Sequence, residues 1–338
     1  MSVHPVSSSD EAIEAIVAFL AREVGIAVRF SGRAPGNSHD GYIFEQVEVP
    51  GRKVLARLKP SDGPFLHYDS ANEELLIKQL AAAGLAVPRV LASGGEEVCG
   101  TPFLVLEWIE GDVLNPQQVS KLPPAERRQM ADEMVRALTR LHGISAGELP
   151  ALDRPDGQDA RPVRYFAQFD QMLDQLAVVD SVTLDYVRVW LQQHVDELAG
   201  ETTLVHGDFR LGNVVWESGR MSGILDWETA RMGNPLFDVG WMCMGARSGS
   251  DSIMGMVTRD EFVRLYRVAS GRHVDQRQLL LWQVAATWVR GCTELRLLDL
   301  ALQAPDPERV DPRDLSWQFG RHRTDAELLR LLSLMESA

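Results

Sequence analysis

Residues 202–228 contain three short runs of strand-forming residues, in a part of the chain whose other segments have helical periodicity. The second and third runs, NVVW and GILDW, are separated by the turn sequence ESGRM and predict a β-hairpin. The first run, TLVH, leads into HGDFRLGN, a loop that contains His206, Asp208 and Asn213. Because a hairpin returns the chain to the end where it began, we expect Asn213 and Asp226 at the same end of this one.

The polar residues around this hairpin are suited to binding a hard cation. Mg²⁺ prefers oxygen ligands and usually takes one or two from the protein, while water and phosphate oxygens complete its shell. Asn213 and Asp226 are therefore candidate ligands, and Asp208, five residues before Asn213, is a candidate base for a hydroxyl group. Enzymes that transfer phosphoryl groups also use separate residues to bind the metal and to accept the proton of the attacking hydroxyl. A single loop Asp or Asn usually serves turn formation, so the inference depends on the combination.

The periodicity of the chain changes near residue 109. Before it, alternation typical of strands occurs at 41–49, 52–58 and 102–111, and helical periodicity at 8–25 and 69–84. In the first helix, Ser8 and Glu11 have capping-box spacing, and Gly25 is the expected end. Beyond residue 109, helical periodicity covers 123–143, 163–177, 184–200, 258–271 and 278–303. We expect an α+β fold with two domains, a small β-rich one at 1–108 and a larger, mostly helical one at 109–338.

Charge and cysteine spacing argue against several classes of protein. The chain has 338 residues and a net charge of −14, whereas nucleic-acid-binding domains usually carry a basic patch, so we expect no nucleic-acid partner. The cysteines lack CxxC spacing, which argues against disulfides and structural zinc. The N-terminal segment lacks a basic start, and the apolar run at 279–289 is too short to span a bilayer. We expect a cytoplasmic protein with no membrane partner, and the sequence does not predict an oligomeric state.

HGDFRLGN followed by GILDWE resembles the catalytic and metal-binding motifs of the aminoglycoside phosphotransferase and choline kinase-like family, whose members are relatives of the protein kinases. Within that family, the run from HGDFRLGNVVW to GILDWETARMGNPLFDVGW is most similar to the phosphotransferase-like domains associated with acyl-CoA dehydrogenases. The resemblance covers nearly the whole chain. It implies a two-lobed protein-kinase-like fold, with a nucleotide-binding lobe at 1–108 and a catalytic and substrate-binding helical lobe at 109–338.

The resemblance also implies roles for residues of the helical lobe. Catalytic roles fall to Asp208, His206 and Asp238, and metal binding to Asn213, Asp226 and Glu228. Asp208 is the implied base. His206 is expected to support the geometry of the loop, with a neutral core histidine as the alternative, and Asp238 to hold the loop through hydrogen bonds. For Glu228 two interpretations stay open, because it either assists the metal or faces solvent.

The nucleotide lobe departs from the usual kinase pattern at one position. Kinase-like folds place a lysine on the third strand as V-x-x-K, paired to a helix glutamate. This chain has VLAR, so Arg57 occupies the matching position, and Lys59 lies two residues further on the same strand face. Arginine is always charged and its fork suits phosphate, but which of the two reaches the phosphates stays open. Glu73 matches the helix partner better than Glu74.

Two further segments of this lobe are candidate nucleotide contacts. The turn that contains Gly36, Asn37 and Ser38 is expected to present backbone amides and a hydroxyl to the phosphates, although it lacks GxGxxG and equally fits an ordinary hairpin loop. Glu107, Trp108 and Ile109 match the hinge between lobes. Backbone groups there would meet the adenine edge, and Trp108 or Ile109 would pack near the base, with a plain edge strand as the alternative.

The predicted function is that of a kinase acting on an alcohol group. The enzyme moves the γ-phosphate of ATP, with GTP as the alternative nucleotide, to a hydroxyl of a small-molecule acceptor, and depends on Mg²⁺. An aminoglycoside-like acceptor suits an acidic cleft, but the acidity of this chain is dispersed. The closer resemblance implies a hydroxyacyl-CoA-like metabolite, whose phosphates Arg161, Arg164, Arg321 and Arg323 are available to bind.

Two other classes of function compete with this prediction. A catalytically inactive nucleotide-binding regulatory module of the same fold is favoured by the VLAR strand and opposed by the presence of Asp208, Asn213 and Asp226. A metal hydrolase that uses His206 and Asp208 is disfavoured, because no second histidine lies nearby and asparagine is a poor zinc ligand.

Overall fold

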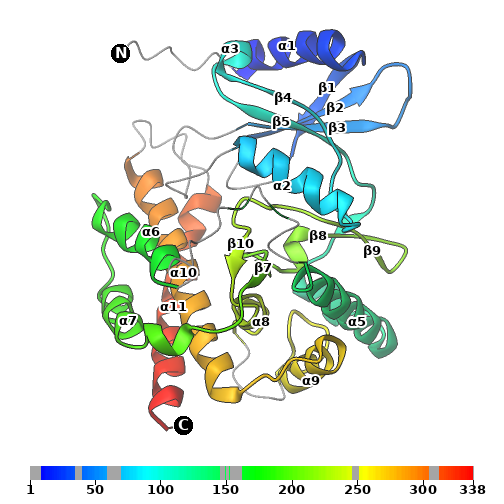
Figure 1. Ribbon diagram of the computed structural model, residues 1–338. Helices are drawn as coiled ribbons and strands as arrows, with labels where there is room; N and C mark the ends of the chain where they lie inside the picture. The colour runs from blue at the N-terminus through cyan, green and yellow to red at the C-terminus, as the bar shows by residue number, and fades with distance from the viewer. Residues whose placement is uncertain are drawn as a thin grey trace. The chain divides into compact units, whose positions relative to one another are not determined.

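Figure 1 shows the computed structural model of the chain, which describes residues 9–34, 40–58, 70–144, 149, 152, 162–245, 251–303 and 312–337. The chain divides into two compact units, Met1–Glu110 with Gly223–Leu225, and Gly111–Ser222 with Asp226–Ala338. The first is built on a β-sheet and the second is mostly helical, so the α+β class is confirmed. The observed division lies two residues beyond the expected one and adds Gly223–Leu225 to the N-terminal unit.

The N-terminal unit contains a five-stranded antiparallel sheet of order β1-β2-β3-β5-β4. Its strands are β1 (Val28–Arg33), β2 (Asp40–Gln46), β3 (Lys53–Leu58), β4 (Val90–Gly94) and β5 (Phe103–Glu107). The helices of this unit are α1 (Ser9–Phe19), α2 (Ser70–Ala82) and the short α3 (Glu96–Cys99). α1 and α2 follow the helical periodicity predicted for these two segments.

The two faces of β3 have different functions because side chains alternate along a strand. Val54, Ala56 and Leu58 are buried in a core that also contains Ile16 of α1. Ring packing between Phe19 and Phe103, with centroids 5.2 Å apart, adds to this core. The opposite face of β3 carries Arg57, which reaches Glu73 of α2. One face of the sheet therefore stabilises the unit, while the other presents charged groups.

Two boundaries in this unit differ from the prediction. α1 continues into a π-helical turn, Leu20–Val24, before it ends at Gly25, whose left-handed φ of 72° lets its N–H bond to the Leu20 carbonyl. Gly25 is thus confirmed as the end, but the π turn has no sequence signature. The strand predicted over 41–49 is wrong at its end: β2 stops at Gln46, because the Glu45 carboxylate accepts the N–H of Gly51 at 3.0 Å and closes a turn.

The C-terminal unit is built mostly from helices. They are α4 (Pro116–Ser120), α5 (Pro124–Leu141), α6 (Pro162–Asp174), α7 (Val182–Gln193), α8 (Leu236–Met242), α9 (Arg259–Ser270), α10 (Gln276–Gln303) and α11 (Pro312–Ser337). Its strands form a two-stranded sheet of β7 (Thr203–Val205) and β10 (Arg231–Gly233), and a three-stranded sheet of β6 (Asp112–Val113), β8 (Val214–Glu217) and β9 (Arg220–Ile224). β8 and β9 are hydrogen-bonded neighbours, which confirms the predicted hairpin. β10 was not predicted.

α10 is the central helix of this unit, and α6, α7, α8 and α11 pack against it (Figure 1). Trp288 is fully buried in α10, contacts the rings of Phe166 and Phe169, and donates its indole N–H to the Leu184 carbonyl at 3.0 Å. α8 approaches α10 so closely that a Cβ on Gly240 would lie 2.9 Å from the backbone of Trp282. Larger residues at position 240 therefore cannot be accommodated without moving α8, the helix that carries Asp238.

The helix predicted over 184–200 is wrong in its second half. α7 ends at Gln193, and a 3₁₀ turn, Val195–Leu198, follows. His194 explains the break: its ring stacks on Trp190, and its Nδ1 lies 2.7 Å from the Trp190 carbonyl that an α-helix would pair with the His194 amide. In the part of the chain that the structure describes, no helix has both the length and the apolar character required to cross a bilayer.

Candidate active site

The candidate active site lies on the loop that joins β7 to β8. β7 pairs antiparallel with β10, so that Val205 stands opposite Arg231, and the loop leaves the sheet at the next residue, His206. A 3₁₀ turn, Leu211–Asn213, then leads directly into β8. Both ends of the loop are therefore fixed by hydrogen-bonded strands, which favours a defined geometry for the polar residues between them.

The Asp208 carboxylate is held by two neighbours on the same loop. The Asn213 side-chain amide donates to Asp208 Oδ2 at 2.7 Å and to the Asp208 carbonyl at 2.9 Å. Arg210 Nε lies 3.0 Å from both carboxylate oxygens. These bonds fix the direction of the carboxylate, as a base that accepts a proton from a bound hydroxyl requires.

Asp208 lies in an environment that disfavours its charge. Burial raises the pKa of its carboxyl above the ordinary value, and the Asp226 charge raises it further, while Arg210, His206 and the Asn213 hydrogen bond lower it. The like charge of Asp226 therefore acts on Asp208, and a divalent cation bound there would relieve the repulsion.

The oxygen atoms around Asp208 fit Mg²⁺ better than zinc. Asn213 uses its amide nitrogen for Asp208, so the amide oxygen is the ligand atom that it offers, and Asp226 would add a carboxylate oxygen. Among the residues that the structure describes, no cluster of three or more His, Cys, Asp or Glu side chains is arranged to hold a metal. Such a cluster is what a zinc hydrolase would need, whereas Mg²⁺ is satisfied by one or two carboxylates plus substrate phosphates.

The backbone at Asp226 departs from the prediction. The strand expected to end at Asp226 ends instead at Ile224, and Asp226 adopts a left-handed φ of 68°. Aspartate tolerates this region better than most residues, but non-glycine residues there usually mark a functional site or strain. The sharp change of direction explains why the strand pattern GILDW stops pairing before its last three residues, Leu225–Trp227.

Asp238 holds the loop from α8, as predicted for a residue that supports it. Its carboxylate is fully buried and accepts the backbone N–H groups of His206 at 2.8 Å and Gly207 at 2.9 Å. It also lies 3.2 Å from His142 Nε2, and His142 Nδ1 lies 2.7 Å from the Tyr266 hydroxyl. Since a carboxylate only accepts hydrogen bonds, His142 donates from Nε2 and accepts from the phenol. This chain links the loop to α5, α8 and α9.

His206 and Gly207 are both tightly constrained. The His206 ring is completely buried against Trp227, with centroids 4.6 Å apart, and its Nδ1 accepts the Asp208 amide at 3.2 Å. Gly207 has a φ of 88°, and a Cβ there would lie 2.6 Å from the Thr229 carbonyl. His206 is therefore a buried residue that contacts the backbone of Asp208, which fits both the supporting role and the alternative of a core histidine.

We expect Asp238→Ala to lower the free energy of unfolding by about 2–5 kcal/mol, since it leaves two backbone donors and a histidine buried without their acceptor. Burial by itself raises the pKa of Asp238, but the His142 hydrogen bond and the nearby histidines outweigh it, so the pKa lies below its ordinary value of 3.8. A carboxyl whose pKa is lowered by folding stabilises the folded protein at pH values above its pKa in the unfolded chain. This stabilisation is lost as the pH falls through its pKa in the folded protein.

The loss measured by urea unfolding should therefore be largest near neutral pH and should shrink as the pH falls below about 4. Asp185→Ala, at an exposed carboxylate of α7, is the matched control and should show neither effect. If Asp238→Ala lost the same free energy of unfolding near neutral pH and below about pH 4, the buried, ionised state of Asp238 would be contradicted.

In the N-terminal unit, Arg57 and Glu73 form an ion pair. Arg57 Nη1 lies 2.9 Å from Glu73 Oε1, and the two side chains are only 11% and 2% exposed. The pair joins β3 to α2 in the position where kinase-like folds place their lysine–glutamate pair. Lys59, Gly36, Asn37 and Ser38 lie outside the described residues.

The segment predicted as the hinge is partly occupied by internal hydrogen bonds. The N–H groups of Glu107 and Trp108 donate to the carbonyls of Arg89 and Lys53, and the Trp108 ring lies 5.6 Å from the Lys53 ammonium. Ile109 packs against Gly223, where a Cβ would lie 2.3 Å from the Ile109 side chain. The backbone N–H groups of Glu107 and Trp108 are therefore not available to the adenine of a nucleotide unless these hydrogen bonds open.

The other predicted residues have mixed outcomes. Glu228 is half-buried, and because its Oε2 atom is buried, the interpretation in which it faces solvent is disfavoured. Arg164 and Arg323 are exposed on α6 and α11, whereas Arg161 and the side chain of Arg321 lie outside the described part of the chain.

Several residues of the site were not predicted. Arg210 lay within the motif but was given no role, and it contacts Asp208 directly. His142 and Tyr266 come from distant segments and carry no motif. Arg231 follows the second motif by a few residues and stacks between aromatic rings. Only Arg210 could have been recognised from its spacing.

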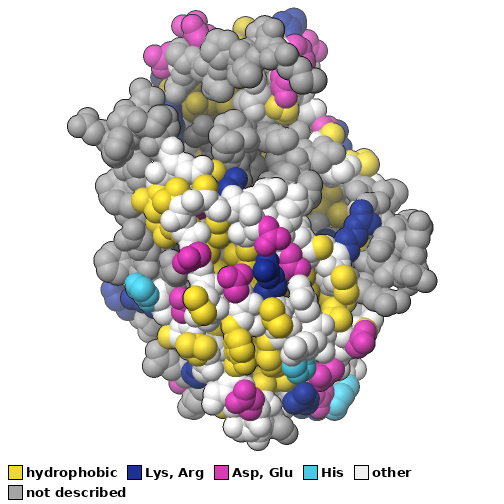
Figure 2. Space-filling view, turned by 90° about the vertical axis from the view of Figure 1, so that its left-hand side faces the viewer, with side chains coloured by type: hydrophobic (Ala, Val, Ile, Leu, Met, Phe, Trp, Pro, Cys, Tyr) yellow, Lys and Arg dark blue, Asp and Glu magenta, His cyan; other side chains and the backbone are white. Residues whose placement is uncertain are grey.

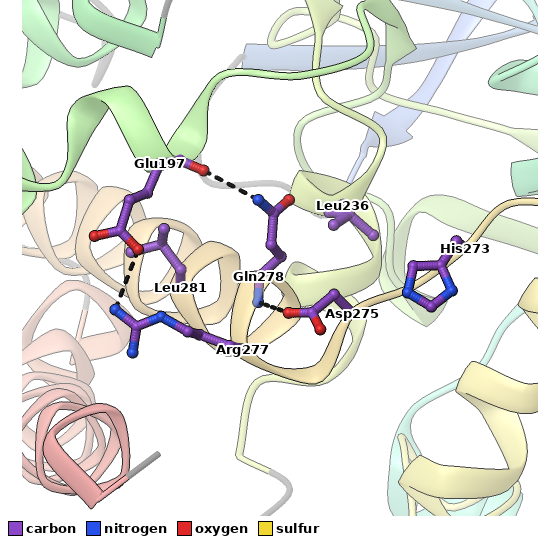
Figure 3. A pocket seen from close by; sticks show the side chains of 7 residues that line it. All are labelled: Glu197, Leu236, His273, Asp275, Arg277, Gln278 and Leu281. Carbon is purple, nitrogen blue, oxygen red and sulfur yellow. Dashed lines mark hydrogen bonds and ion pairs between the residues drawn. The ribbon is translucent and has the colours of Figure 1, made fainter.

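A pocket of about 450 Å³ lies near the start of α10 (Figure 3). Its lining consists of Glu197, Leu236, His273, Asp275, Arg277, Gln278 and Leu281. Arg277 pairs with Glu197 at 3.1 Å, and the Asp275 carboxylate caps α10 by accepting the backbone N–H of Gln278 at 2.9 Å (Figure 3). The lining includes none of the predicted site residues, and several of its charged groups already have partners in the protein.

The chain is similar to proteins of known family. Mouse acyl-CoA dehydrogenase family member 10 is 28% identical over 255 residues, which cover 70% of this chain but only 23% of that protein. Rat acyl-CoA dehydrogenase family member 11 is 28% identical over 197 residues, which cover 57% of this chain and 25% of that protein. The chain therefore spans about a quarter of the length of these relatives.

Solved structures and a family model identify the fold. A "putative aminoglycoside phosphotransferase" from Ralstonia eutropha JMP134 matches with a TM-score of 0.72 and 21% identity, over 95% of this chain and 98% of that one. This likeness shows the fold, which is that of the aminoglycoside phosphotransferases, as the resemblance in the motifs implied. The model of the phosphotransferase enzyme family matches residues 30–280, well over half of the sequence, and the chain therefore belongs to that family.

Proposed function

We propose that the protein transfers the γ-phosphate of ATP to a hydroxyl group of a small molecule, with Mg²⁺ as the cofactor. The observation that carries this proposal is the orientation of the Asp208 carboxylate by Asn213 and Arg210. A base with a fixed direction beside a pair of hard-oxygen ligands is what phosphoryl transfer requires.

Each polar residue of the loop then has a separate role. Asp208 accepts the proton of the acceptor hydroxyl as that oxygen attacks phosphorus. Asn213 and Asp226 would hold Mg²⁺, which supplies neutralisation of phosphate charge when bound. His206 and Asp238 keep the loop in shape, because the first accepts the amide of Asp208 and the second accepts the two amides before it.

In the N-terminal unit, we assign Arg57 to the nucleotide phosphates and Glu73 to orienting it, because the pair is almost completely buried. Lys59 stays the alternative. The residues Gly36, Asn37 and Ser38 would cover the phosphates, and Ile109 with the carbonyls of Glu107 and Trp108 would contact the base. GTP is the alternative nucleotide.

The acceptor is a small hydroxylated molecule. Aminoglycosides are polycations and would be favoured by an acidic surface, yet charged side chains of both signs alternate with hydrophobic ones on the described part of the face in Figure 2. A hydroxyacyl-CoA-like metabolite is the second acceptor class, and exposed Arg164 and Arg323 are basic groups that would suit its phosphates.

A nucleotide-binding module without catalysis is the competing function, and one observation favours it. Arg57 stands where the usual lysine is expected, and its rigid planar guanidinium follows a phosphate less freely than a flexible ammonium. Such a module would bind Mg²⁺ and ATP but would not consume ATP.

The test is ATP consumption by the purified protein against a panel of acceptors. Aminoglycosides, choline-like alcohols, sugars and hydroxyacyl-CoAs are each added with ATP and Mg²⁺, and ADP release and the phosphorylated product are measured. Acceptor-dependent, Mg²⁺-dependent ADP release supports the proposal. Binding of ATP and Mg²⁺ with no ADP release for any acceptor class would favour the inactive module.

A further inference from the structure

Arg231, the first residue of β10, is held between two aromatic side chains of the C-terminal unit. Its guanidinium carbon lies 3.3 Å from the centre of the Tyr165 ring and 4.2 Å from the centre of the Phe237 ring. The two rings are nearly perpendicular, with an interplanar angle of 87° and centroids 5.7 Å apart. Cation–π contacts of this kind fix the plane of a guanidinium but leave its N–H groups in that plane free to donate.

The charge of Arg231 has no ion-pair partner among the described residues. Its one side-chain hydrogen bond runs from Nη1 to the Thr229 carbonyl at 3.3 Å, although arginine has five N–H donors. Two other half-buried arginines of this unit have carboxylate partners: Arg272 pairs with Glu201 at 2.7 Å, and Arg296 with Asp299 at 3.5 Å.

The surroundings disfavour the charge unless a ligand compensates it. Burial lowers the pKa of Arg231, and the influence of Tyr165 and Asp238 offsets this only in part. The carboxylate of Asp238 is already used by His206, Gly207 and His142. Arg231 is half-buried, so the residue as a whole is not sealed from solvent.

Arg231 also lies beside the backbone that leads to the proposed base. A Cβ built on Gly207 would stand 2.9 Å from Arg231 Nη1, and Gly207 immediately precedes Asp208. An acceptor whose hydroxyl reaches Asp208 would therefore bind one residue along the loop from the place where Arg231 meets it.

We propose that Arg231 binds an oxyanion of the acceptor, so that the acceptor is an anionic hydroxylated metabolite with a carboxylate or phosphate only a few bonds from the reacting hydroxyl. This inference rests on the proposed function, because it identifies the acceptor class of the same site. The planar fork of arginine matches the two oxygens of such a group, and the ligand would supply a counter-charge that no described residue supplies through an ion pair. A polycationic aminoglycoside would instead be repelled.

Binding without ATP tests the inference separately from catalysis. The probes are 3-hydroxybutyrate and glycerol 3-phosphate, their neutral counterparts 1,3-butanediol and glycerol, and kanamycin as a cation, each titrated calorimetrically into the full chain. We expect the wild type to bind one of the anions at least about tenfold more tightly than its neutral counterpart, which corresponds to about 1.4 kcal/mol. The probe that binds distinguishes carboxylate from phosphate.

Arg231→Met should abolish this preference, and Arg231→Lys, which keeps the charge but loses the fork, should retain part of it. Arg220→Met is the matched control: Arg220 is an exposed arginine of β9 that pairs with Glu133 at 3.3 Å, and its loss should change nothing. Thermal unfolding checks that the variants fold. If Arg231→Met does not fold, the comparison of wild type with Arg231→Lys decides.

The inference is overturned if the wild type shows no preference for either anion, if it prefers kanamycin, or if the preference survives in Arg231→Met. These outcomes are independent of the failure of the proposed function. A protein that binds the anion through Arg231 but never consumes ATP would contradict phosphate transfer and leave the anion site in place.

Discussion

Asp208→Ala is expected to lower the rate of phosphate transfer by about 10²–10⁴-fold, the range that a general base contributes, while ATP binding stays largely intact. The alanine removes the only carboxylate that Asn213 and Arg210 both contact among the described residues, but it leaves the ion pair of Arg57 with Glu73 unchanged. Single-turnover transfer and equilibrium binding of ATP, measured on the same preparation, separate the two effects.

Two further variants strengthen this test. Asp208→Asn keeps the shape of the side chain and removes its basicity, so it should be nearly as slow as alanine. Glu217→Ala removes an exposed carboxylate from β8 of the same hairpin and should transfer phosphate at the wild-type rate. Because burial disfavours the charge of Asp208, we expect Asp208→Asn to unfold at the same temperature as the wild type or a higher one. Full turnover by Asp208→Ala would refute the assignment.

Asp226→Asn is expected to weaken the binding of ATP in the presence of Mg²⁺ by roughly 10–100-fold or more. Loss of a residue that only supports a metal ligand already costs a metal site this much affinity, and Asp226 is a proposed ligand itself. Asparagine is chosen because Asp226 has a φ of 68°, a region that asparagine adopts more readily than alanine. The variant keeps an oxygen at the same place and removes its charge. It therefore tests the charge of the ligand without adding backbone strain.

The informative measurement is the ratio of ATP affinities with and without Mg²⁺. For Asp226→Asn we expect this ratio to fall while the affinity without metal is unchanged, and for Asn213→Ala we expect a smaller fall, because a neutral amide contributes less to a cation. Glu217→Ala again serves as the control. A wild-type Mg²⁺ dependence in Asp226→Asn would show that the metal, if it binds, is held elsewhere.

Much of the site could be predicted because its residues are close together in sequence. His206, Asp208 and Asn213 lie on one loop, and Asp226 is separated from them only by a two-stranded hairpin that a turn sequence identifies. The alternation of residues in β3 similarly indicates that Arg57 lies on the face opposite the core. Local spacing and the period of the strand are enough to reach these conclusions.

Other features could not be predicted, because they depend on contacts between distant segments. The π turn before Gly25 and the break at His194 depend on where single hydrogen bonds form, and periodicity does not report this. The support of Asp238 by His142 and Tyr266 joins three helices that are far apart in the chain.

The α+β class, the hairpin and the identity of the polar residues on the loop could be inferred from the amino-acid sequence, because each depends on local periodicity or on a motif within some twenty residues. The environment of those residues depends on the folded chain. The fold half-buries Asp208, which raises the pKa of its carboxyl, and it leaves Arg231 between two aromatic rings without a carboxylate partner among the described residues. Burial and charge compensation are properties of the packed chain, since they depend on which groups the fold brings together and which it leaves for a ligand.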